Sequence, residues 1–335
     1  MNILLTSVGR RSYMVNYFRE ALDGTGLVHA ANSELTYAMQ IADKSVITPL
    51  IYEGNYIDFL LKYCQENEIR AIISLFDIDL PILSRNKKLF NNSGVQVIVS
   101  DYGLTQVCND KWETYLYLKS RGFNIPLTFV KKHEAIVALQ NKDIDFPIII
   151  KPRWGMGSIG IFQADNYTEF EVLYQKTLHC INNSYLRYES GEAPDECIIV
   201  QEKLKGQEYG LDVFHDFDGN FLSCVPKKKL AMRAGETDSA EIIDDPKLTE
   251  LCQKLSECTK HIGNLDVDCF YVNGKYYILE MNCRFGGQYP FSHLAGVNFP
   301  KAIIQMVLNM KPDSNLLIPI VGTIGAKDLT PVKIK

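Results

Sequence analysis

Short apolar runs alternate with amphipathic segments over the first hundred residues of the chain. The apolar runs predict strands at residues 3–6, 45–48, 71–75 and 95–99, and the segments between them predict helices at about 12–22, 55–67 and 80–90. Strands that alternate with helices in this way form a parallel sheet covered by helices. We therefore predict an α/β unit at the N-terminus.

The pattern changes beyond residue 108. A helix is predicted at 110–120, and an apolar run at 147–150 leads into a glycine-rich stretch. Further along, Asp218-Gly219 and Asn273-Gly274 each lie between alternating strands, as hairpin turns do. The C-terminal part is therefore expected to be α+β with antiparallel strands.

The composition is typical of a soluble globular chain. Its 335 residues are 46% hydrophobic and 22% charged, and because single cores stop growing near 250–300 residues, we expect two or three packed units. A net charge of -5 without a long basic block argues against a nucleic-acid partner. The nine cysteines contain no Cys-x-x-Cys pair and predict buried thiols in a reducing compartment. We see no signal peptide or spanning segment, so we expect a cytoplasmic protein without a membrane partner.

The stretch from Gly155 to Gly160 matches the G-x-G-x-x-G pattern of dinucleotide-binding folds. Those folds need a helix to begin at the last glycine, whereas the residues after Gly160 are apolar and helical periodicity begins near Asn166. We therefore expect the loop to join two antiparallel strands and to cover a triphosphate with its backbone N–H groups. An ordinary glycine-rich hairpin is about as consistent with these residues taken alone.

Two lysines are candidates for phosphate contacts. Lys151 ends the strand before the glycine-rich loop, where its ammonium can reach a phosphate. Lys111 lies in the first turn of a predicted helix, where a cation opposes the helix dipole and a nearby phosphate would remove the conflict. A side chain that simply extends into water explains Lys111 as well.

The predicted hairpin around Asn273-Gly274 carries the clearest chemistry. Alternation along its second strand places Glu280, Asn282 and Arg284 on one face and Leu279, Met281 and Cys283 in the core. A two-residue type I′ turn would pair Asp268 with Leu279, on the face opposite Glu280. A type I turn with a G1 bulge would pair Asp268 with Ile278 and bring it to the face of Glu280.

Two carboxylates and an amide oxygen on one face would suit Mg²⁺ shared with nucleotide phosphates. Arg284 beside them could neutralise developing charge. The alternative is an amphipathic hairpin with a solvated face. We favour the metal site, because Glu280 interrupts an apolar run and the glycine-rich loop supplies a phosphate cradle.

In order and spacing, these motifs resemble the ATP-grasp superfamily, most closely its carbamoyl-phosphate-synthase-like and biotin-carboxylase-like members. The resemblance covers nearly the whole chain. It implies a Rossmann-like domain at residues 1–107 and an ATP-grasp domain at 108–335, with a lid at about 118–196 and a catalytic subdomain at about 197–325.

The resemblance also implies a role for each motif. The phosphate contacts would be Lys111, Lys151, Gly155, Gly157, Ser158 and Gly160. The adenine hinge would be Gln201, Glu202, Lys203 and Leu204, and Glu208 would hold the ribose. The magnesium ligands would be Asp268, Glu280 and Asn282, and the catalytic residues would be Arg284 and Lys151. ATP and Mg²⁺, for which Mn²⁺ can substitute, are the implied cofactors.

The activity implied by the resemblance is ATP-dependent carboxylate-amine ligation. A small-molecule acid would be activated as an acyl phosphate and joined to an amine or amino acid, with release of ADP and phosphate. Gly9, Arg10, Lys229 and Arg233 are candidates for holding the acid, although a solvated basic loop explains Lys229 and Arg233 nearly as well. We find no second ATP-grasp half, which speaks against carbamoyl-phosphate synthesis by this chain alone.

Other functions remain open at this point. A small-molecule kinase would share the nucleotide site and stop at phosphoryl transfer, and a non-catalytic sensor would bind ATP without turnover. A homodimer is compatible with the resemblance. The residues do not identify the acid or the amine.

Overall fold

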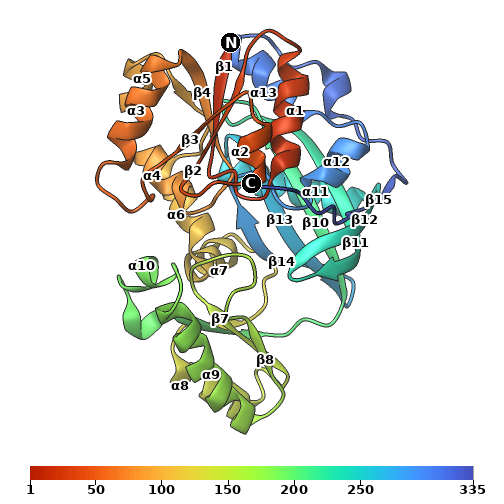
Figure 1. Cartoon of the computed structure of the whole chain (residues 1–335). Helices are drawn as coiled ribbons and strands as arrows, with labels where there is room; N and C mark the ends of the chain where they lie inside the picture. The colour runs from red at the N-terminus through yellow and green to blue at the C-terminus, as the bar shows by residue number, and fades with distance from the viewer. Residues whose placement is uncertain (335) are drawn as a thin grey trace.

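The computed structural model describes residues 1–334 and contains one parallel and two antiparallel sheets (Figure 1). This arrangement confirms the predicted α/β class with an α+β C-terminal part. No helix among the described residues has the length and apolar character needed to span a membrane.

The N-terminal unit is a five-stranded parallel sheet in the order β3-β2-β1-β4-β5. Its strands are β1 (Asn2–Thr6), β2 (Val28–Asn32), β3 (Lys44–Ile47), β4 (Ile69–Ser74) and β5 (Gln96–Val97). Its helices are α1 (Ser12–Leu22), α2 (Tyr37–Ile41), α3 (Tyr56–Glu66), α4 (Asp79–Arg85) and α5 (Lys87–Asn92). The prediction missed β2, and the single helix expected at 80–90 is divided at Asn86.

Two helices and a four-stranded sheet follow. The helices α6 (Tyr102–Asn109) and α7 (Lys111–Ser120) lead into strands β6 (Thr128–Phe129), β7 (Ile148–Pro152), β8 (Phe162–Ala164) and β9 (Ile198–Glu202), in the order β6-β9-β7-β8. Beside them lie α8 (Lys132–Asn141), α9 (Tyr167–Asn182), α10 (Arg187–Ser190) and a 3₁₀ turn at Pro194–Glu196. Because this sheet has a core of its own, it forms a distinct body at the bottom of Figure 1.

The C-terminal sheet has six strands in the order β14-β13-β10-β11-β12-β15. They are β10 (Gln207–His215), β11 (Phe221–Arg233), β12 (Glu236–Ile242), β13 (Gly263–Val272), β14 (Lys275–Asn282) and β15 (Ile324–Ala326). Helices α11 (Pro246–Thr259), α12 (Tyr289–Leu294) and α13 (Phe299–Val307) and a 3₁₀ turn at Ser314–Leu317 complete this part. Two apolar clusters join it to the parallel sheet, the first through Ile3, Phe18 and Phe299, so these two parts share their cores.

The prediction that all nine cysteines are free thiols is wrong for one pair. Cys224 on β11 and Cys252 on α11 form a disulfide, because α11 packs against β11 and brings the two sulfur atoms together. Another pair, Cys108 and Cys283, is buried and forms no disulfide, and its sulfur atoms are hydrogen-bonded at 3.2 Å.

Candidate active site

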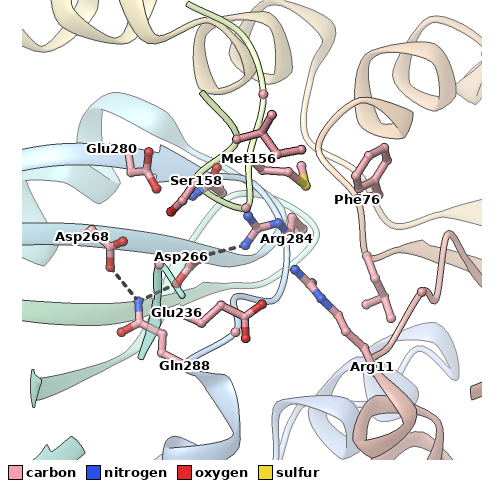
Figure 2. A pocket seen from close by; sticks show the side chains of 18 of the residues that line it. Arg11, Phe76, Met156, Ser158, Glu236, Asp266, Asp268, Glu280, Arg284 and Gln288 are labelled. Atoms are coloured by element: carbon pink, nitrogen blue, oxygen red, sulfur yellow. Dashed lines mark hydrogen bonds and ion pairs between the residues drawn. The ribbon is translucent and has the colours of Figure 1, made fainter. Parts of the chain in front are cut away.

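A cavity of about 350 Å³ lies where the three sheets meet. The loops after β1 and β4 line one side of it, the glycine-rich loop between β7 and β8 lines another, and β13, β14 and the following loop form the floor (Figure 2). The tip of the β11–β12 hairpin closes the remaining side. The cavity therefore collects residues that are far apart in the sequence.

The β13–β14 hairpin adopts neither of the two predicted registers. Asn273 and Gly274 form a two-residue turn with φ values of 49° and 82°, as a type I′ turn requires. The ladder then shifts between Asp268 and Cys269, so that Leu279 is an extra residue and Asp268 lies opposite Glu280. The bulge thus brings both carboxylates to one face despite the type I′ turn.

Because of the same bulge, the predicted core face of β14 is wrong at Leu279. Ile278, Met281 and Cys283 are buried in the shared core, whereas Leu279 is only partly buried. The alternation breaks at Leu279 because a bulge places two residues opposite one on the neighbouring strand.

The three predicted magnesium ligands line the cavity together. Asp268, Glu280 and Asn282 all contribute to its wall, and they offer only oxygen atoms, which suit Mg²⁺. Within residues 1–334 no cluster of three His, Cys, Asp or Glu side chains forms a metal centre alone. Proteins usually bind Mg²⁺ through one or two carboxylates, with substrate phosphates completing its coordination.

Lys229 lies beside these carboxylates. Its ammonium is 2.7 Å from Asp268 and 2.6 Å from Glu208, the predicted ribose ligand. Burial alone would lower the pKa of Lys229, but the two carboxylates raise it. Lys229 therefore bridges the predicted metal and ribose positions, although sequence reasoning proposed it for the acid.

Arg284 is held by carboxylates from two parts of the chain. Its guanidinium is 2.9 Å from Asp77, in the loop after β4, and 2.8 Å from Asp266 on β13. Burial would lower the pKa of Arg284, and these carboxylates raise it. Gln288 donates a hydrogen bond of 2.5 Å to Asp266 and completes the network.

Of the two predicted phosphate lysines, Lys111 lines the cavity and Lys151 does not. Lys151 on β7 is buried and donates a hydrogen bond of 2.9 Å to Gln201, and burial lowers its pKa to about 8. Lys111 bonds the carbonyl oxygen of Gly155 in the glycine-rich loop. Asp110 caps α7 and accepts hydrogen bonds from Arg153 Nε at 2.8 Å and Nη2 at 2.7 Å, which positions Lys111.

The glycine-rich loop joins antiparallel strands, as predicted. Its backbone has positive φ at Gly155, Gly157, Ser158 and Gly160, and α9 begins after its Asn166 cap rather than at the last glycine. The Ser158 hydroxyl rests against Gly235 at the β11–β12 tip, where an added Cβ would clash. The loop is therefore seated on the hairpin and roofs the cavity.

The predicted adenine hinge lies outside this cavity. Gln201 and Glu202 are on β9, where Gln201 bonds Lys151 and Thr128, and the Glu202 carboxylate accepts from the backbone of Leu127. The segment from Lys203 to Gly206 then connects β9 to β10. Only Glu208, through Lys229, is linked to the cavity wall.

Comparison with known proteins agrees with this architecture. A model described as "PylC-like, N-terminal domain" matches residues 3–98, and one described as "ATP-grasp in the biosynthetic pathway with Ter operon" matches residues 195–321. Residues 195–321 thus match an ATP-grasp family, and the chain resembles the ATP-grasp superfamily.

Curated relatives of this chain are distant and longer. The carbamoyl phosphate synthase large chain of Pseudothermotoga lettingae is 22% identical over 289 residues, which are 83% of this chain and 24% of that protein. The D-alanine–D-alanine ligase of Thermotoga petrophila is 26% identical over 207 residues, 56% of this chain and 61% of the ligase. The chain thus spans less than two thirds of either relative.

Solved structures share the ATP-grasp fold over nearly the whole chain. An L-amino acid ligase from Bacillus licheniformis superposes with a TM-score of 0.75 at 18% identity, covering 99% of this chain and 81% of that one. The N5-carboxyaminoimidazole ribonucleotide synthetase from Thermotoga maritima gives 0.69 at 16%, covering 96% and 79%.

Of the predicted acid-binding residues, Gly9, Arg10 and Lys229 line the cavity of this chain. Arg233 does not, because it is half exposed and pairs with Asp238 at 2.9 Å. Sequence reasoning missed three wall or network residues: Phe76, Asp77 and Asp266. Asp266 alone had a signal, since it lies two positions before Asp268 on the same strand face.

Proposed function

We propose that this chain is a Mg-ATP-dependent ligase that activates a small-molecule carboxylate as an acyl phosphate and joins it to an amine or amino acid. The observation that carries the proposal is the single cavity in which Asp268, Glu280 and Asn282 face the glycine-rich loop and Arg284 (Figure 2). Relatives named as D-alanine–D-alanine ligase and L-amino acid ligase support the same reaction class.

Phosphoryl transfer needs positioning and charge neutralisation more than covalent chemistry from the protein. Lys111 and Lys151 would contact the triphosphate, and the glycine-rich loop would exclude water from the acyl phosphate. Mg²⁺, held by Asp268, Glu280 and Asn282, would neutralise phosphate charge. In this proposal Glu208 binds the ribose and the segment Gln201–Leu204 binds adenine.

Arg284 would stabilise the transferred phosphoryl group. A substrate carboxylate oxygen attacks the γ-phosphorus as the bond to ADP breaks. The amine nitrogen then attacks the acyl carbon, phosphate leaves and the amine loses a proton. Because Asp77 and Asp266 already fix Arg284, its guanidinium needs little reorganisation during the reaction.

We further propose a division of labour between the parts of the chain. Residues 1–107 would select the substrate, a lid at about 118–196 would cover the phosphates, and the remainder would supply the metal and adenine contacts. The sheet of this lid extends to Glu202, since β9 pairs with β7.

The direct test is a screen for ADP release that crosses carboxylic acids with amines in the presence of Mg-ATP. Ligation predicts phosphate release that depends on both an acid and an amine. A stable phosphorylated product would instead identify a kinase. ATP binding without turnover across the panel would identify a sensor.

A further inference from the structure

The order of the parallel sheet marks a binding crevice beside the predicted metal face. The chain runs from β1 to β2 on one side and returns to β4 on the other, so connections leave β1 and β4 in opposite directions. In open α/β sheets, ligands bind at such a switch point, outside the carboxyl ends of the strands. The two loops at this point, residues 7–11 and 75–76, both line the cavity.

Arg10 and Arg11 are the charged residues that these loops contribute to the cavity wall, and Figure 2 shows Arg11 pointing toward Arg284. Arg11 donates a hydrogen bond of 2.6 Å to the carbonyl oxygen of Phe285. Among residues 1–334, Arg284 and Lys229 each pair with two carboxylates, whereas no carboxylate lies within ion-pair distance of Arg11. An enclosed guanidinium without a counterion is costly, and an anionic ligand would offset that cost.

The end of α1 adds to the positive potential at this point. Arg11 is the residue before the helix, no side chain caps the helix, and its first turn contains no acidic residue. The free N–H groups of an 11-residue helix carry partial positive charge that favours an anion. The helix end and the guanidinium therefore attract the same kind of group.

Part of the cavity wall is apolar. Val8, Leu75, Phe76 and Met156 contribute to this part, and Phe76 and Met156 lie near each other above Arg11 in Figure 2. A cavity of about 350 Å³ that must also admit phosphates leaves room for only a small organic body. These four side chains favour a ligand with an apolar body.

We propose that Arg11 binds the carboxylate of the acid substrate, and that this substrate has an apolar body of amino-acid size that packs against Phe76 and Met156. The inference rests on the proposed ligase function. Arg11 holds the carboxylate beside Arg284, with one carboxylate oxygen free to attack the phosphate. Glu236 lines the same cavity, pairs with Lys327 at 3.1 Å, and would share its carboxylate with an α-amino substituent.

The test uses the full chain with hydroxylamine in place of the unknown amine, so that any acyl phosphate is trapped and ADP release is read directly. The probes are L-leucine, L-methionine and L-phenylalanine, their deaminated acids, and their amides, which lack the carboxylate. The variants are Arg11→Gln and Arg11→Lys. Arg70→Gln is the matched control, because Arg70 is an exposed arginine on β4 that does not line the cavity.

We expect at least one apolar acid, and none of the amides, to support ADP release. Arg11→Gln should raise KM for that acid about tenfold or more, as loss of a charge-assisted bond does, and leave KM for ATP within about twofold. Arg11→Lys should recover part of the loss, and Arg70→Gln should stay within about threefold of the parent. The amino and deaminated arms show whether the α-amino group is needed.

Equal acid KM values for Arg11→Gln and Arg70→Gln would overturn the inference, and so would activity confined to polar or dicarboxylic acids in a widened panel. Thermal stabilisation by Mg-ADP separates the two proposals. If Mg-ADP stabilises the parent chain and no apolar acid supports ADP release, the inference alone fails. If Mg-ADP does not bind, the ligase proposal fails with it.

Discussion

The two ends of the cavity balance their charges differently. At the proposed nucleotide end, Lys229 is already paired with Glu208 and Asp268, at 2.6 and 2.7 Å. At the proposed substrate end, Arg11 has a carbonyl oxygen as its partner and no carboxylate among the described residues within ion-pair distance. Phosphate and metal binding would therefore have to rearrange the ion pairs of Lys229. An acid would instead bind Arg11 without breaking an ion pair.

The strongest way to break the nucleotide end is to remove one of its carboxylates. Glu280→Gln should lower kcat about 10²-fold or more, because the metal that neutralises phosphate charge would lose a ligand, and leave the fold intact. Steady-state ADP release and thermal unfolding measure the two effects. Glu241→Gln is the control, because it removes the same charge from a residue of β12 that does not line the cavity. Unchanged activity in Glu280→Gln would refute the metal assignment.

Asp77 tests the junction between the two ends. Asp77→Asn should lower kcat/KM about tenfold and the free energy of unfolding by about 1–3 kcal/mol, because Arg284 loses one of its two charged partners. Urea denaturation and ADP-release kinetics report these changes. Asp58→Asn removes the same charge from the exposed face of α3 and should change neither quantity.

Lys151 makes nucleotide affinity depend on pH. Burial lowers its pKa to about 8, so the ammonium is mostly charged at pH 7 and mostly neutral at pH 9. If phosphate binding needs the charged form, the apparent Kd for Mg-ATP should be about tenfold weaker at pH 9 than at pH 7. Calorimetric titration measures this slope, and a slope that persists in Lys151→Met would assign it to another group.

The smallest expected effect tests whether Mg²⁺ can take the position that the Lys229 ammonium occupies beside Asp268. Lys229→Met leaves Glu208 and Asp268 facing each other without a cation, so its melting temperature without metal should fall. Mg²⁺ alone should then raise the melting temperature of this variant by about 2 °C or more beyond its effect on the parent. Lys228→Met, the neighbouring residue on β11, serves as the control, and equal metal shifts in both variants would contradict the shared position.

The nucleotide end was more predictable from sequence than the substrate end, for a physical reason. Hydrophobic periodicity predicted the sheet class, and local motifs predicted that Lys151 precedes a hairpin loop rather than a helix. Arg284 meets Asp77 across 207 positions, and Arg11 meets Phe285 across 274. Such contacts depend on how separate parts pack, and no local pattern records them.

The bulge at Leu279 was also beyond local reasoning, because both predicted registers placed any irregularity in the turn. The observed shift lies within the strand, five positions past Gly274. The turn keeps the type I′ geometry that Asn-Gly favours, and the irregularity moves to the point where the carboxylates face each other.

The bulge at Leu279 changes the difference in residue number between facing residues of β13 and β14. In a regular hairpin with a two-residue loop, the residue numbers of two facing residues differ by an odd number. Val272 and Lys275 follow this rule, and so do Cys269 and Ile278. Asp268 and Glu280 face each other with an even difference. An even difference in residue number between facing residues therefore reveals the bulge. In any homologous hairpin with the same turn, an even difference in residue number between the two facing carboxylates is evidence that the extra residue is retained.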